Sequence, residues 1–208
     1  MTPSDYHRQN LRGTLLELAE QTVRTAGVEA LSLRQLARDA GVSHAAPARH
    51  FRDRRALLDA LALAGFERLD ASIDAAAAGE GPFTVRFRGA AHAYVGFAVE
   101  NTELLGLMFT IKHEEGASAE LVETARRAID TTVALLARGQ AEGEVAPGDP
   151  ERLAQVVFAT VQGVAMLVTG GLLDGTTATE LTDSAVDVLL RALPVPSDEG
   201  ARAVLADG

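Results

Sequence analysis

The chain has 208 residues, of which 47% are hydrophobic and none is cysteine, so the composition excludes a disulfide framework and a thiolate metal site. The formal net charge of −10 disfavours nucleic-acid binding by the chain as a whole. The charge is unevenly distributed, because residues 1–60 hold nine arginines against seven acidic residues, whereas residues 61–208 are strongly acidic. An N-terminal head can therefore still present a basic face to DNA.

Three helices are predicted in the N-terminal head. Apolar residues at helical spacing predict a helix over 5–26. A second helix is expected over 33–40 with Ser32 as its N-cap, and a third over 43–51. Gly41 separates the second helix from the third, where a left-handed backbone costs little only for glycine. Two short helices joined by such a turn have the form of a helix-turn-helix.

The rest of the chain predicts a helical body. Asp53 is a suitable N-cap for a long helix over 54–79. Later helices are expected at 83–100, 102–113, 117–142, 149–173 and 178–193. The sequence has no strand-like alternation, so we expect an all-α fold. It would consist of a three-helix DNA-binding domain over 1–53, a larger domain over 54–193 and a loose tail over 194–208.

The segment 33–58 contains what a helix-turn-helix DNA reader needs. Four apolar residues are candidates for the inner face that fixes the two helices: Leu36, Ala37, Val42 and Phe51. The outer face must offer donors to base edges and phosphates, and Arg49 can read a guanine or bind a phosphate. A surface helical hairpin with solvated arginines has the same spacing and is the alternative interpretation.

The stretch GVSHAAPARHFRDRRALL closely resembles the DNA-binding domain of the TetR family of bacterial regulators. The matching features are LRQLARDAGVS, the aromatic Phe51, and the basic Arg54 ahead of two leucines. The resemblance covers about residues 8–60. One departure is Ala48, where most relatives have an aromatic residue that contacts a DNA phosphate, so this one contact is in doubt. The resemblance implies these DNA-contacting residues: Ser32, Ser43, His44, Ala46, Arg49, His50 and Arg54.

The segment 93–110, AYVGFAVENTELLGLMFT, looks like the TetR subgroup with a "WHG" type C-terminal domain. This resemblance implies that residues 54–193 form a helical ligand-binding and dimerisation domain. Four aromatic residues share one helical face over 83–97, which is typical either of plain core or of a pocket wall. We expect a small apolar or aromatic effector. The predicted pocket residues are Phe83, Phe87, His92, Tyr94, Phe97, Met108, Phe109, His113, Phe158, Gln162 and Met166.

Residues 153–173 carry no formal charge and contain three glycines. Their length would suffice for a membrane span, but the polar residues within the run and the acidic flanks favour a soluble helix without a membrane partner. The resemblance implies that this helix and the one over 178–193 form a homodimer interface, although an ordinary core would look the same in sequence. The predicted interface residues are Val157, Gly163, Val164, Leu167, Gly171, Val188 and Leu189.

These features predict a cytoplasmic bacterial transcriptional regulator. We expect a homodimeric repressor that a small molecule releases from a palindromic operator, and the sequence leaves open an activator instead. No cofactor and no metal are expected, since His92, His113 and Glu114 match no recurring ligand motif. We do not expect an enzyme, because no nucleophile–base pair and no phosphate loop is present. The alternatives are a helical interaction or membrane-associated protein, or a helical enzyme.

Overall fold

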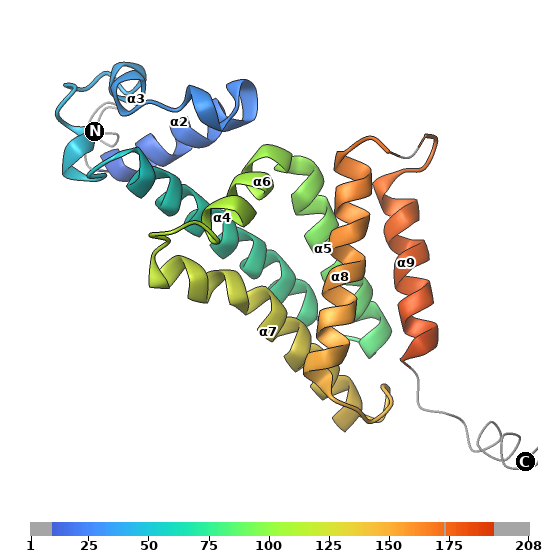
Figure 1. The fold of residues 1–208 in the computed structure, drawn as a ribbon. Coiled ribbons are helices and arrows are strands. Elements are labelled where there is room, and N and C mark those ends of the chain that lie inside the picture. Colours follow the sequence, from blue (N-terminus) through green and yellow to red (C-terminus); the bar gives the residue numbers. More distant parts are fainter. Residues whose placement is uncertain (1–9, 173, 194–208) are drawn as a thin grey trace, which may run out of the picture. The chain divides into compact units, whose positions relative to one another are not determined.

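The structure is a computed structural model and describes residues 10–172 and 174–193. Every regular element in these residues is helical, which confirms the expected all-α class. Figure 1 shows the elements in chain order. They are α2 (Leu11–Ala26), η1 (Val28–Ala30), α3 (Leu33–Asp39), η2 (Pro47–Arg49), α4 (Arg54–Ala77), α5 (Phe83–Glu100), α6 (Thr102–Ile111), α7 (Ala119–Ala141), α8 (Pro150–Thr169) and α9 (Ala178–Ala192).

The chain divides into two compact units, which we call unit 1 and unit 2. Unit 1 consists of the chain up to Arg68 together with Asn101–Ala125, and it contains α2, η1, α3, η2 and α6. Unit 2 consists of Leu69–Glu100 and the chain from Arg126 onward, and it contains α5, α8 and α9. Helices α4 and α7 each contribute to both units. The predicted domain boundary at residue 53 stays a prediction, and the predicted tail over 194–208 lies outside the described residues.

Local sequence signals explain most of the helix ends. The side chain of Asn10 caps α2 by accepting from Gly13 N at 3.3 Å, and α2 ends at Ala26, where Gly27 is the C-cap with a φ of 79°. Asp53 caps α4 by accepting from Ala56 N at 2.8 Å, as the sequence predicts. Helix α9 begins with a complete capping box. Its members are Thr177 and Glu180.

The predicted third helix over 43–51 is wrong. The chain makes turns at residues 44–46 and then only the short 3₁₀ helix η2. Pro47 accounts for this difference, because it lacks the N–H that would close the first α-helical bond onto Ser43 O. Ala46 N donates to Ser43 O instead, at 2.9 Å, which is the tighter spacing of a turn. The backbone of the recognition segment is therefore a series of tight turns.

Each unit has its own apolar core. In unit 1, α2 packs against α3 and α6, and it buries Leu15, Ala19 and Val23 at helical spacing. In unit 2, α5 packs against α8 and α9, which also pack against each other. Part of the aromatic face of α5 is buried in this core: Phe83, Phe87 and Tyr94. Burial of such side chains, at about 1.5–3 kcal/mol each, is the main favourable contribution to folding.

Helix α8 is the one helix in the described residues that is long and apolar enough, by length and composition, to cross a membrane. Only 28% of its most apolar window is buried within the chain. One face of α8 packs in the core of unit 2, whereas a second apolar face is solvent-exposed in the single chain. Monomeric soluble proteins rarely expose contiguous apolar surface of this kind, so the second face indicates an interaction surface.

Candidate nucleic-acid interface and apolar cavity

The predicted DNA-contacting residues all belong to unit 1, between Ser32 and the start of α4. Five are exposed: Ser32, Ser43, His44, Arg49 and His50. Ala46 and Arg54 are half-buried. Behind them, Leu36, Ala37 and Phe51 are buried and fix the segment to the body of the unit, whereas Val42 is half-buried. The backbone turn at Gly41, with φ 66°, lies where the sequence places it, and Val42 N donates to Ala37 O across it at 2.9 Å.

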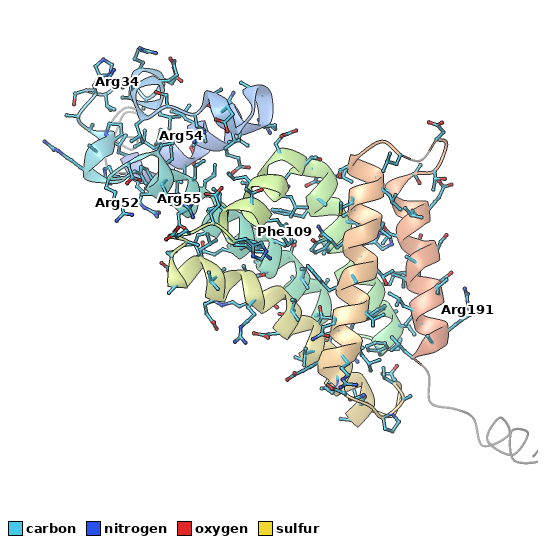
Figure 2. The ribbon with its side chains drawn as sticks, viewed as in Figure 1. Arg34, Arg52, Arg54, Arg55, Phe109 and Arg191 are labelled. Atoms are coloured by element: carbon cyan, nitrogen blue, oxygen red, sulfur yellow. The ribbon has the colours of Figure 1, made fainter. Side chains whose placement is uncertain are left out.

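Two exposed arginines in this part of unit 1 have no acidic partner. Within the described chain, neither Arg49 nor Arg34 lies within 4.0 Å of a carboxylate, so both guanidinium groups are available to an external anion. Arg34 lies in the first turn of α3 and is labelled in Figure 2. The sequence reasoning missed Arg34, although its position two residues after the Ser32 N-cap was a usable signal. A pair of unpaired arginines beside an exposed turn can bind phosphates or guanine edges.

Arg54 has a different environment from the one the resemblance implies. Its Nη2 donates to Val28 O at 2.6 Å and its Nε to Leu31 O at 3.2 Å, so it ties the start of α4 to η1. Glu29 lies 3.5 Å from the same guanidinium. The side chain is thus already engaged within unit 1. We infer that Arg54 positions the recognition segment, and that any phosphate contact is secondary to this role.

The described part of unit 2 contains a small, mostly apolar cavity of about 40 Å³. Helices α4, α5, α7 and α8 contribute its walls: Ile73, Phe87, Ala90, Ala91, Tyr94, Thr132, Leu135, Val157, Phe158 and Val161. Its volume is enough for a few water molecules, whereas pockets for drug-sized ligands measure about 300–1,000 Å³. An effector would therefore have to widen the cavity on entry.

The polar group beside this cavity is the Tyr94 hydroxyl, which donates to Gln162 Oε1. Burial raises the pKa of Tyr94, so its phenol stays neutral at physiological pH. The ring of Tyr94 meets that of Phe158 edge to face, with centroids 6.0 Å apart. A ligand that enters here would meet the part-buried Tyr94–Gln162 pair and Thr132 within otherwise apolar walls.

The structure brings together only part of the predicted pocket. Phe87, Tyr94 and Phe158 line the cavity, and Gln162 is bonded to one of them. Phe83 is buried and stacks on Phe87 at 5.2 Å. The other predicted residues lie elsewhere. Phe97 is half-buried, His92 pairs with Asp183, Met166 is exposed on α8, and Met108, Phe109 and His113 belong to unit 1.

Only some of the predicted dimer-interface residues are exposed in the structure. Val157, Val164 and Leu189 are buried inside unit 2, so their side chains are not available to a partner. The second apolar face of α8 and α9 retains two of the predicted residues, Leu167 and Val188, which are exposed. Its exposed members are Val156, Met166, Leu167 and Val188, of which the sequence reasoning missed Val156 and placed Met166 in the pocket. Gly163 is half-buried, and a side chain at its position would meet no atom within 4 Å.

A charged cluster joins α5 to α9 in unit 2. Arg88 Nη1 donates to Asp183 Oδ1 at 2.7 Å, and Arg88 also bonds to Asp187. His92 Nε2 lies 2.9 Å from Asp183 Oδ1. The hydrogen bonds from His92 and then from Arg88 lower the pKa of the Asp183 carboxyl. The sequence reasoning assigned His92 to the ligand pocket, whereas the structure gives it this bridge between helices.

Comparisons with known proteins cover almost the whole chain. The family model described as bacterial regulatory proteins, tetR family, matches residues 15–61, and the one described as tetracyclin repressor-like, C-terminal domain, matches residues 87–193. No curated protein sequence matches the chain. The WHG subtype expected from residues 93–110 stays a prediction.

Solved structures are similar over most of this chain. A protein of unknown function from Rhodococcus sp. RHA1 is 48% identical, with 93% of this chain and 99% of that chain covered and a TM-score of 0.85. The TetR family transcriptional regulator PfmR from Thermus thermophilus is 22% identical, with coverages of 85% and 97% and a TM-score of 0.68. The ketosteroid transcriptional regulator KstR2 of Mycobacterium tuberculosis is 18% identical, with coverages of 90% and 96% and a TM-score of 0.67. The last two similarities show the fold alone.

Proposed function

Since this chain belongs to the tetR family of bacterial regulatory proteins and is therefore a DNA-binding transcriptional regulator, we propose that it is a homodimeric repressor released from a palindromic operator by a small apolar or aromatic effector. The observation that carries the proposal is the exposed segment from Ser32 to His50 with its unpaired arginines, fixed to a buried core. A bacterial regulator of this kind acts in the cytoplasm, where the chromosome lies.

The DNA-reading part of the proposal rests on unit 1. Arg49 and His50 are exposed donors that suit base edges, and Ala46 is small enough to allow close approach of DNA. Ser32 and Ser43 are exposed hydroxyls that suit phosphates. We add Arg34 as a phosphate contact, because it is exposed and has no acidic partner in the described chain. The half-buried Arg54 supports this surface from behind.

The dimer part of the proposal rests on the second apolar face of α8 and α9. Met166 is 64% exposed, and Val156, Leu167 and Val188 lie on the same two helices. A two-fold copy of this face would cover all of them, since an isologous interface pairs one patch with itself. The same exposed face favours the alternative of membrane association. Soluble, monodisperse protein prepared without detergent would exclude that alternative.

The effector part of the proposal rests on the cavity of unit 2. Its walls are apolar apart from Thr132 and the Tyr94–Gln162 pair, which suits a small apolar or aromatic molecule with one polar group. Ile73 of the cavity lies on α4, the helix that begins at Arg54 in unit 1. By linkage, an effector that weakens operator binding about 100-fold must itself bind the DNA complex that much more weakly, a coupling near 3 kcal/mol.

The direct test is binding of Arg49→Ala to a duplex that the wild-type protein has selected from random sequence. We expect Arg49→Ala to lose about 1–3 kcal/mol of binding free energy, because it removes a base or phosphate contact. Arg191→Ala is the matched control, since Arg191 is also an exposed arginine but lies on α9 in unit 2 (Figure 2). Equal binding by both variants would contradict the proposed interface.

A further inference from the structure

Unit 1 contains an open cleft that the proposed function does not use. Its volume is about 340 Å³, within the range of about 300–1,000 Å³ that is usual for small-molecule pockets. Its walls come from η1, from the start of α4, and from one face of α6 with a residue that follows it. All of these residues belong to unit 1, and none of them lines the apolar cavity of unit 2.

Gly106 lines this cleft from the middle of α6. Glycine is less favourable than alanine in a helix interior, and the φ of Gly106 is not positive, so the helix itself does not require it. Packing does not require it either. A Cβ at Gly106 would meet no atom of the described chain within 4 Å, whereas a Cβ at Gly65 of α4 would lie 2.6 Å from Met108 Sδ. Gly106 therefore keeps open a space that a larger side chain would fill.

The charged side chains of the cleft include one carboxylate without a basic partner. Figure 2 labels the two arginines of the cleft, Arg54 and Arg55, at the start of α4. Arg54 lies 3.5 Å from Glu29, and Arg55 pairs with Glu114, so both positive charges are offset within unit 1. Glu103 is exposed in the first turn of α6. No basic side chain lies within 4.0 Å of it in the part of the chain that the structure describes.

The face of α6 in the cleft offers hydrogen-bond acceptors on both sides of Gly106. Glu103 lies three residues before this glycine and Thr110 four residues after it, so the three residues share one helical face. The Thr110 hydroxyl donates to Gly106 O at 2.9 Å, and its oxygen is left able to accept. Apolar contacts come from Leu58 and Leu107, which are buried at the base of the cleft walls.

We propose that this cleft binds a small organic cation, a primary ammonium group on a short apolar body. The ammonium donates to the Glu103 carboxylate and to the Thr110 hydroxyl oxygen, and the apolar body lies over Gly106 against Leu107. An anion is disfavoured, because the unpaired charge of the cleft is negative and both arginines are already paired. This second site goes beyond the proposed function and does not rest on it, since the walls of the cavity in unit 2 contain no charged side chain.

The test is isothermal titration calorimetry of the full chain with three probes of similar size: phenethylamine, phenethyl alcohol and phenylacetate. At about pH 7.5 the first is a cation, the second is neutral and the third is an anion. Glu103→Gln removes the negative charge of the cleft. Glu120→Gln is its matched control, because Glu120 is also an exposed glutamate in the first turn of a helix and belongs to unit 1, but does not line this cleft. Gly106→Leu fills the space, and leucine favours a helix more than glycine does.

We expect the wild type and Glu120→Gln to bind phenethylamine equally, and to bind the other two probes about tenfold more weakly or less, because only the cation gains a charge-assisted hydrogen bond. Glu103→Gln should lose about tenfold in affinity for phenethylamine for the same reason. Gly106→Leu should not bind it, with an unchanged circular dichroism spectrum.

The proposal would be overturned by a wild type that binds no phenethylamine, by equal affinities of Glu103→Gln and Glu120→Gln, or by an alcohol that binds as tightly as the amine. A folded Gly106→Leu protein that binds like the wild type would overturn it as well. If Gly106→Leu does not fold, Glu103→Gln and its control decide the matter. None of these measurements involves DNA, so their failure leaves the proposed function intact, and a failure of DNA binding leaves this site intact.

Discussion

Replacement of Arg54 tests whether this residue stabilises the fold of unit 1 or contacts a DNA phosphate. Two backbone carbonyls accept from its guanidinium, at 2.6 Å and 3.2 Å, and its side chain is 41% exposed. A hydrogen bond from a charged donor contributes about 1.5–3 kcal/mol, and partial exposure puts these two near the lower limit. Arg54→Met keeps the apolar stem of the side chain but removes both bonds. We expect it to lower the free energy of unfolding by about 2–3 kcal/mol.

The assay is urea unfolding followed by circular dichroism, combined with DNA binding at several salt concentrations. Arg52→Met is the matched control, since Arg52 is 81% exposed and pairs only with its neighbour Asp53 in the described chain. It should change stability by less than about 0.5 kcal/mol. Each phosphate contact contributes about 0.9 to the slope of log affinity against log salt, and we expect Arg54→Met to leave this slope unchanged. Unchanged stability together with a slope reduced by about one would refute the structural role.

Three further predictions concern unit 2. Met166→Glu should give monomers by analytical ultracentrifugation. Val85→Glu is the control and should stay dimeric, because Val85 on α5 is 56% exposed and Met166 is 64% exposed. A monomeric wild-type protein would contradict the interface. Leu135→Ala should lower the free energy of unfolding by about 2–5 kcal/mol, because it enlarges the cavity. Benzene should raise the thermal unfolding temperature of this variant more than that of the wild type, and an equal effect on both proteins would show that the cavity admits no such ligand. Because the pKa of the Asp183 carboxyl is lowered in the folded state, its stabilising contribution is present above its unfolded pKa of about 3.9 and is lost as pH falls further. The stability difference between wild type and Asp183→Asn should therefore shrink below about pH 4, and a difference that persists at lower pH would argue against the ion pair.

The helices of the body could be predicted closely because their ends are marked by local chemistry. Gly116, Gly143 and Gly175 all adopt positive φ values at the expected breaks. The recognition segment was predicted with the right residues but the wrong backbone. There, Pro47 falls one position too far into the expected helix, so the missing N–H prevents its first hydrogen bond.

The cavity and the interface could be predicted only in part, because both depend on which apolar face of a helix meets which neighbour. Helix α8 has two apolar faces, and periodicity alone does not say that Val164 points to the core while Met166 points to solvent. The cavity walls include small residues such as Ala90 and Ala91, which leave no distinctive mark in a sequence. Long polar side chains were similarly ambiguous, since His92 faces Asp183 on a helix some ninety residues later.

The measurement that tests the central claim most directly is the selection of bound duplexes from a random pool, followed by sequencing. A symmetric dimer that carries one recognition segment on each protomer predicts a palindromic site, with half-site centres about 10–10.5 base pairs apart or a multiple of this spacing. The same selection with the Met166→Glu protein should enrich isolated half-sites weakly or none. If the wild-type protein enriches no sequence over random DNA, or enriches a site without two-fold symmetry, the account of a dimeric operator-binding regulator is contradicted.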